Sequence, residues 1–131
     1  MDNVPDRYKT LIPDRRSAEL LEVYKIGTAN ALEFQIPYQD YTIGHILRKE
    51  LLSMPQVTFA GMKTPHPLES KIVIRLQTNP SGFLSDTIQA TPENCFQSAL
   101  TKITESMELI KKTFMAAVDD YSIMHTHPGS I

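Results

Sequence analysis

The sequence predicts an α+β domain in which one helix covers a small antiparallel sheet and a long helix follows at the carboxyl end. The observations behind this are an amphipathic segment from Asp40 to Met54, alternating apolar residues up to Thr78, and a continuous apolar period after Thr91. At 131 residues the chain is expected to form one domain. We expect residues 1–16 to form an N-terminal arm and residues 122–131 a flexible tail.

Composition and charge exclude several classes of protein. The chain is 41% hydrophobic and 21% charged, and its formal net charge is −2. Because the charges are evenly spread, we expect no direct contact with nucleic acid and no attraction to an anionic membrane. No apolar run approaches the length of a membrane span. Cys95 is the only cysteine, which excludes an internal disulfide and favours a reducing compartment such as the cytosol or nucleus.

Two segments in the first third of the chain are predicted strands. Ser17 to Tyr24 fits either a strand or a short helical turn, and we favour the strand. Asn30 to Ile36 is a clearer strand because apolar and polar residues alternate along it. Pro37 ends this strand, since proline cannot donate a hydrogen bond to a neighbouring strand. The apolar face of this strand comprises Leu32, Phe34 and Ile36.

The segment after Pro37 predicts a helix. Either Asp40 or Thr42 can cap its start, and Pro55 disfavours helix at the residue before it. Gly44 predicts a place where another backbone packs closely, because glycine inside a helix costs about 1 kcal/mol relative to alanine. The apolar residues recur at spacings of three and four and share one stripe: Ile43, Ile46, Leu47, Leu51 and Met54.

Val57 to Thr78 predicts two further strands, separated by a turn at Pro65-His66-Pro67. Ile72, Ile74 and Leu76 alternate with more polar residues, so one face of the last strand is apolar. Residues 79–91 contain proline, glycine and small polar residues, which is typical of a loop long enough to be mobile.

The last helix is predicted to begin at Thr91, as its cap, with Pro92 in the first position, and to continue to about Tyr121. About 30 residues at 1.5 Å each give a helix of roughly 45 Å. A compact domain of this size has a diameter of about 36 Å, so part of the helix needs a partner chain. Its apolar residues form an unbroken heptad seam: Phe96, Leu100, Ile103, Met107, Ile110, Phe114, Ala117 and Tyr121.

No catalytic or metal-binding pattern stands out. There is no glycine-rich phosphate loop, no His-Glu-x-x-His and no nucleophile elbow, and we expect no cofactor. Glu105 and Glu108 lie off the apolar seam, which favours a solvated face over an acid–base pair. His125 and His127 lack further ligands, which favours a disordered tail over a metal site. His66 has no accompanying nucleophile, and Cys95 fits a semi-buried structural residue better than a reactive thiol.

Two motifs carry a resemblance to a known family. Asp40-Tyr-Thr-Ile-Gly-His-Ile-Leu47 resembles the Asp-His-Thr-Leu-Gly-Asn-x-Leu signature of the α-like assembly subunits of multisubunit RNA polymerases. Phe59-Ala-Gly-Met-Lys-Thr-Pro-His-Pro-Leu-Glu69 is closer still to the eleventh subunit of eukaryotic RNA polymerase II. Tyr41 and His45 depart from the usual histidine and asparagine, and the 79–91 loop is longer than is typical.

The resemblance implies a non-catalytic nuclear subunit that pairs with the third, α-like polymerase subunit and helps to assemble the two largest subunits. On the heterodimer interface we expect, besides the heptad seam through Ala117, the residues Ile43, Gly44, Ile46 and Leu47. The resemblance also places a basic pair, Arg48 and Lys49, on the side that meets the large subunits. The other expected contacts with the large subunits are Gly61, His66 and Pro67.

Three other interpretations stay open from the sequence. The α-like subunit shared by polymerases I and III has the same fold, and the archaeal subunit L is similar. From a different class, the chain could be a small homodimeric ligand-binding enzyme of α+β type. Behaviour of the chain alone separates these classes, because an independent enzyme should be well folded whereas an obligate subunit should aggregate or self-associate.

Overall fold

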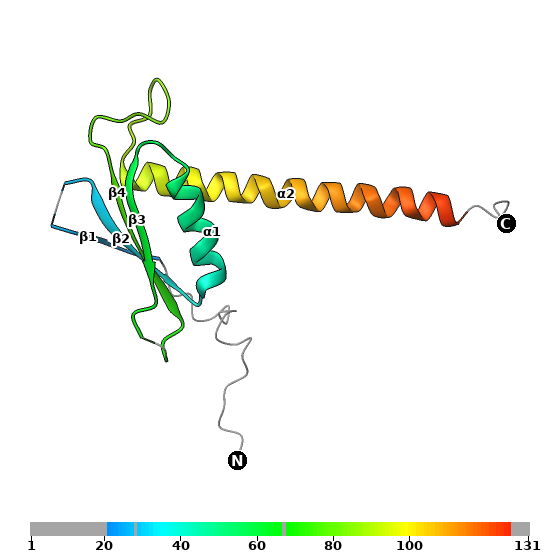
Figure 1. Ribbon diagram of the computed structural model, residues 1–131, viewed down its shortest axis with the longest axis horizontal. Helices are drawn as coiled ribbons and strands as arrows, with labels where there is room; N and C mark the ends of the chain where they lie inside the picture. Colours follow the sequence, from blue (N-terminus) through cyan, green and yellow to red (C-terminus); the bar gives the residue numbers. More distant parts are fainter. Residues whose placement is uncertain (1–20, 28, 67, 127–131) are drawn as a thin grey trace, which may run out of the picture.

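The computed structural model describes residues 21–27, 29–66 and 68–126 and has the predicted α+β architecture (Figure 1). Four strands form one antiparallel sheet in the order β1-β2-β4-β3, with β3 at one edge. The elements in chain order are β1 (Glu22–Lys25), β2 (Ala31–Pro37), α1 (Tyr41–Leu52), β3 (Val57–Lys63), β4 (Lys71–Thr78) and α2 (Pro92–His125).

The predicted strands are largely confirmed, with shifts at their ends. The first strand begins at Glu22 and ends at Lys25, and the predicted arm lies outside the described residues, as does the part of the predicted strand before residue 21. The second strand includes Pro37 as its last residue, paired with Lys71 of β4. Alternation along β2 and β4 places Phe34 opposite Ile74 on the covered face, where both are buried.

The sequence offered both Asp40 and Thr42 as the residue that caps the start of helix α1. The Asp40 carboxylate accepts a hydrogen bond from the Thr42 backbone N–H at 2.9 Å, so Asp40 is the cap. The buried arc of α1 consists of Gly44, Leu47 and Leu51, whereas Ile46 is 37% exposed. The predicted stripe, which counted only large apolar residues, was therefore wrong about Ile46.

Gly44 lies where α1 contacts the sheet. A Cβ atom at this position would overlap with Met62 Sδ and would lie 3.3 Å from Ile72 Cδ1. The expected close approach is therefore present, but the neighbours are side chains of β3 and β4 and not another backbone. Without a side chain at Gly44, α1 can lie directly on the sheet.

We expect Gly44→Leu to lower the free energy of unfolding by about 1–3 kcal/mol or more, because a leucine side chain cannot fit between α1 and the sheet. Gly44→Ala should have a much smaller effect, since the Met62 side chain is flexible and alanine favours helix. Urea unfolding followed by circular dichroism measures both. An unchanged midpoint for the leucine variant would mean that α1 does not contact the sheet here.

The loop at 79–91, expected to be mobile, is held by hydrogen bonds. The Leu84 N–H donates to the Ile88 carbonyl at 2.8 Å, and an isolated β-bridge joins Phe83 to Gln89. The Gln56 side chain donates to the Phe83 carbonyl at 2.8 Å and joins the loop to the turn between α1 and β3. Only the contact from Gln56 comes from a residue distant in sequence, and the mobility of the loop stays a prediction.

Helix α2 starts as predicted and ends later. The Thr91 hydroxyl accepts from the Asn94 N–H at 3.2 Å, and Pro92 occupies the first position. The helix has 34 residues and continues to His125, so the prediction of a tail from residue 122 was wrong for its first four residues. At 1.5 Å per residue α2 is about 51 Å long, and it extends far beyond the sheet (Figure 1).

Candidate dimerisation surface

The apolar seam of α2 divides into a buried part and an exposed part. Near the start of the helix, Phe96 is 5% exposed and its ring stacks on Phe34 of β2 with centroids 4.1 Å apart. Ile103 is half-buried against the same core. From residue 104 to residue 126 every residue is exposed. The exposed seam comprises Leu100, Met107, Ile110, Phe114, Ala117 and Tyr121.

Helix α1 borders this exposed seam. Glu50 of α1 forms an ion pair with Lys102 of α2, with Nζ and Oε1 3.9 Å apart. Ile46 lies one turn before Glu50, so it is on the side of α1 that faces α2. Ile43 is half-buried and packs against the core. Ile46 can therefore extend the apolar surface from α2 onto α1.

Three residues that were predicted to contact a partner lie inside this chain instead. Leu47 and Phe96 are buried members of its own core, and Gly44 is covered by Met62. A partner cannot touch them while the domain is folded in this way. We therefore leave Gly44, Leu47 and Phe96 out of the candidate surface.

The residues predicted to contact the large polymerase subunits belong to α1, to β3 and to the turn after β3, and not to the exposed seam of α2. Arg48 and Lys49 are exposed on α1, outside its buried arc. The Phe59 ring covers Gly61 in β3, since a Cβ there would meet Phe59 Cζ at 2.8 Å. His66 is exposed, and its Nδ1 accepts from the Leu68 N–H at 3.2 Å. Pro67 lies outside the described residues.

Cys95, His125 and His127 were not expected to be reactive or to bind a metal ion. Cys95 is fully buried, and burial raises the pKa of its thiol, which disfavours the reactive thiolate. His125 belongs to α2, where its ring stacks on Tyr121 with centroids 3.9 Å apart, so the tail interpretation was wrong for it. His127 lies outside the described residues. Among the described residues, no group of three or more histidine, cysteine or acidic side chains could hold a metal ion.

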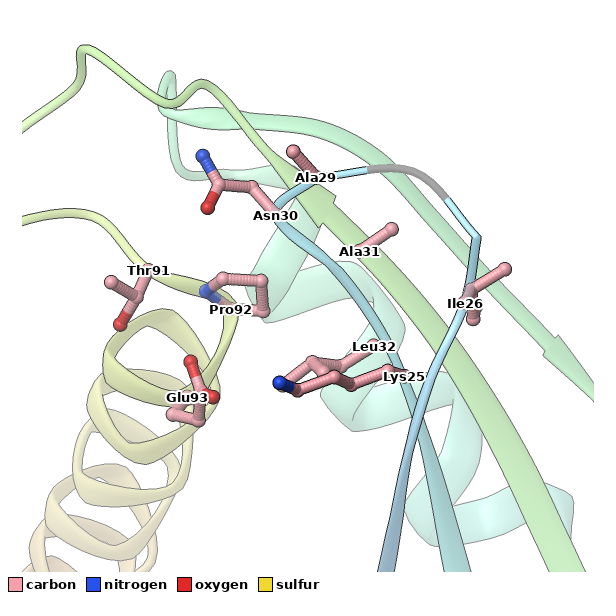
Figure 2. A pocket seen from close by; sticks show the side chains of 9 residues that line it. All are labelled: Lys25, Ile26, Ala29, Asn30, Ala31, Leu32, Thr91, Pro92 and Glu93. Carbon is pink, nitrogen blue, oxygen red and sulfur yellow. The ribbon is translucent and has the colours of Figure 1, made fainter.

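An open cavity of about 360 Å³ lies beside the first turn of α2, and Figure 2 shows the side chains that line it. Lys25 from β1 and Glu93 from α2 contribute its charged side chains. It pairs no nucleophile with a base, so it offers no catalytic arrangement.

In the described part of the chain, no helix is long and apolar enough to cross a membrane.

Several exposed apolar residues of α2 outside the seam were not predicted. Leu109 and Ile123 are 66% and 62% exposed and lie on the opposite side of the helix from the seam. Their signal was a second row at heptad spacing, with Ala116 between them. Met115 and Val118 are further exposed apolar residues of the same half of α2.

A small sheet covered by α1 and the start of α2, with an apolar helix extending beyond it, defines a domain that interacts with another protein. The family model of the RNA polymerase Rpb3/Rpb11 dimerisation domain matches residues 31–113. The chain belongs to this family. The match includes α1, all of β2, β3 and β4 and the first two thirds of α2, and it ends just before Phe114.

Several relatives of this chain are named as RNA polymerase subunits. The probable DNA-directed RNA polymerase II subunit RPB11 of Caenorhabditis elegans is 38% identical over 89 residues, which are 68% of this chain and 66% of that protein. The Dictyostelium discoideum DNA-directed RNA polymerase II subunit rpb11 is 28% identical over 88% of this chain and 90% of that protein. The chain thus spans about two thirds of the nematode relative, at 66%, and most of the Dictyostelium one, at 90%.

Two further matches come from other polymerases. The DNA-directed RNA polymerases I and III subunit RPAC2 of Saccharomyces cerevisiae is 33% identical over 68% of this chain and 63% of that protein. The crystal structure of RNA polymerase subunit L from Thermoplasma acidophilum has a TM-score of 0.63 and 21% sequence identity. The match covers 84% of this chain and 100% of the archaeal chain. It is evidence for the fold and not for the function.

Proposed function

We propose that this chain is a non-catalytic assembly subunit of nuclear RNA polymerase II. It forms a heterodimer with the third, α-like subunit and holds surfaces for the two largest subunits. The observation that carries the proposal is the exposed seam of α2, which continues the buried seam of the same helix into solvent. Membership of a dimerisation-domain family supports a partner of the same family on this seam.

The size of the exposed seam supports an obligate partner. Met107, Ile110, Phe114 and Tyr121 are each about half to two thirds exposed. Burying a large apolar side chain contributes about 1.5–3 kcal/mol, so covering these four contributes up to roughly 6–12 kcal/mol. The upper part of this range is comparable to the whole stability of a domain. A chain that left this surface in water would forgo that stabilisation and would be prone to self-association.

The polymerase II assignment is favoured over polymerases I and III by the two RPB11 relatives. The C. elegans relative is 38% identical, compared with 33% for the yeast subunit of polymerases I and III over the same number of residues. Affinity purification of the tagged chain from native cells, with mass spectrometry of the recovered chains, tests the assignment. Recovery of the largest polymerase II subunit and an α-like subunit is expected. Recovery of polymerase I and III subunits instead would contradict polymerase II membership.

Arg48 is proposed to contact a large subunit and not the α-like partner. Its side chain is exposed on α1, and arginine can form paired hydrogen bonds with a carboxylate. We expect Arg48→Ala to leave the heterodimer intact and to weaken recruitment of a large subunit by about 2–5 kcal/mol if the contact is buried. Reconstitution from purified subunits with gel filtration measures this. Normal recruitment would confine the contact surface to Gly61 and His66.

We expect neither the chain nor its heterodimer to bind DNA or RNA measurably at physiological salt. Affinity for phosphates without sequence preference needs clustered cations, and this chain carries a net charge of −2 with the charges dispersed. Fluorescence anisotropy with labelled single-stranded and double-stranded probes measures it. Micromolar binding with a steep dependence on salt would show a direct nucleic-acid role.

A further inference from the structure

The face of the sheet that the two helices leave uncovered has an open cavity at its β3 edge. Both helices lie on one side of the sheet, where they pack on Phe34 and Ile74 (Figure 1). Val73 points to the other side, because successive side chains of a strand point to opposite faces. The cavity on that side has a volume of about 170 Å³ and is lined by Phe59, Gly61, Met62, Lys63, Val73 and Arg75.

The strands give this cavity an apolar floor. Val73 is only 2% exposed, although neither α1 nor α2 lies on its face of the sheet. A Cβ atom on Gly61 would lie 2.8 Å from Phe59 Cζ, so the missing side chain leaves room for the Phe59 ring. Gly61 does not have a positive φ, so glycine serves here for space and not for its backbone conformation. The Phe59 side chain is 52% exposed and offers an apolar contact to another molecule.

Two cationic side chains border this floor. In the register of β3 with β4, Lys63 is opposite Val73. Arg75 is opposite Gly61, and its Nε–H donates to Glu33 Oε1 at 3.0 Å. The Arg75 side chain stays 51% exposed, whereas that of Glu33 is 17% exposed. Among the described residues Lys63 forms no ion pair, so these three side chains carry one excess positive charge.

A carboxylate is the anion that fits this charge balance. It carries a single charge, and it can accept hydrogen bonds from the Lys63 ammonium and from the terminal N–H groups of Arg75. The hydrogen bond from Arg75 lowers the pKa of the Glu33 carboxyl, and the charge of Lys63 lowers it further, so Glu33 is ionised at neutral pH. The Glu33 charge would repel the row of phosphates that a nucleic-acid strand presents.

The position of β3 in the sheet makes the cavity accessible to a segment of another chain. In the described part of the chain, β3 is an edge strand whose only strand neighbour is β4. A segment that lies along an edge strand in extended conformation presents every second side chain to the same face. A carboxylate and an apolar side chain two residues apart can therefore reach the two cations and the Phe59 ring together.

We propose that this cavity binds an acidic segment of one of the two largest polymerase subunits. The carboxylate of the segment lies between Lys63 and Arg75, and a neighbouring apolar side chain lies on Phe59. The proposal rests on the proposed function and names the chemistry of the contact expected at Gly61. Because the cavity is on the face of the sheet away from both helices, its occupant does not compete with the α-like partner on the exposed seam.

Carbodiimide coupling of the polymerase, purified from native cells through a tag on this chain, tests the proposal. The reagent joins a lysine amine directly to a carboxylate that contacts it and adds no spacer. We expect mass spectrometry to find Lys63 joined to an aspartate or glutamate of a large subunit. In the purified heterodimer, Lys63 should not be joined to the α-like subunit. A purified polymerase in which Lys63 is joined to no other chain would overturn the proposal.

Charge reversal gives a second test. Lys63→Glu should weaken recruitment of a large subunit to the heterodimer by about tenfold or more, because it replaces an attraction by a repulsion. Lys71→Glu is the matched control, since it changes the net charge equally on the same face of the sheet. The Lys71 ammonium pairs with Glu69 at 3.3 Å and does not line the cavity, so this variant should change recruitment less than about twofold. Neither lysine is buried, so both variants should form the heterodimer.

The contradicting results differ from those for the proposed function. Equal effects of the two substitutions would overturn the proposal, because net charge and not the cavity would then govern recruitment. Binding of labelled single-stranded RNA by the heterodimer, abolished by Lys63→Glu, would overturn it in favour of a phosphate site. Normal recruitment by Lys63→Glu would overturn this proposal alone and leave the proposed function standing. If the unaltered heterodimer recruits no large subunit, the proposed function fails and this proposal fails with it.

Discussion

Replacement of Ile110 or Phe114 by aspartate is expected to abolish pairing with the α-like subunit while this chain stays folded. The two side chains are 68% and 66% exposed, and they lie on the part of α2 that is exposed beyond the sheet. Their loss removes nothing from the core. In the heterodimer, each aspartate would place an uncompensated charge in a dry seam, which costs several kcal/mol. Co-purification with a tagged partner measures pairing, and circular dichroism measures folding.

Lys112→Asp is the matched control for this experiment. Lys112 is exposed on the same half of α2 but lies off the seam, so 1:1 pairing should be normal. If the seam and control variants lose pairing equally, the partner does not lie on the proposed side of the helix. If Ile110→Asp and Phe114→Asp both pair normally, the exposed half of α2 is not the interface.

The second large effect is a difference between two phenylalanines of the α2 seam, one of which affects folding and the other pairing. We expect Phe96→Ala to lower the free energy of unfolding by about 3–5 kcal/mol, because Phe96 is buried and stacks on Phe34. We expect Phe114→Ala to change the stability of the isolated chain very little and to weaken heterodimer formation instead. Urea unfolding at sub-micromolar concentration and a binding titration with the partner give the two readouts.

Comparison of Phe96→Ala with Phe114→Ala shows which part of the α2 seam belongs to the core and which part belongs to the interface. Equal loss of stability for both would mean that α2 folds back onto the sheet of its own chain. Little loss for Phe96→Ala would mean that the start of α2 is not part of the core.

The heptad period predicted that α2 exists. It did not predict the residue after which α2 no longer packs on the rest of the domain. Phe96 and Phe114 both belong to the predicted seam, and no sequence signal shows that one is buried and the other exposed. What separates them is the width of the sheet, which covers only the first three turns of the helix. Length gave a useful bound, since a helix longer than the body must extend beyond it. The residue where exposure begins, near Thr104, required the structure.

Small residues account for the other errors about the site. The buried residues of α1 and α2 include the small residues Gly44, Cys95 and Ala99, and the latter two are fully buried. A pattern built on large apolar residues misplaces the buried arc toward Ile46, because it gives no weight to residues that allow close approach. The hydrogen bond from Gln56 to the Phe83 carbonyl of the 79–91 loop could not be predicted, because the two residues are 27 apart in the sequence.

The central claim is that the exposed seam of α2 is the interface with an α-like subunit. Co-expression of this chain with the α-like polymerase subunit of the same organism, followed by gel filtration with light scattering, tests it most directly. We expect a single species whose mass equals one copy of each chain at low concentration, and association or aggregation of this chain when it is expressed alone. A stable monomer at micromolar concentration that does not bind the α-like subunit would contradict the claim.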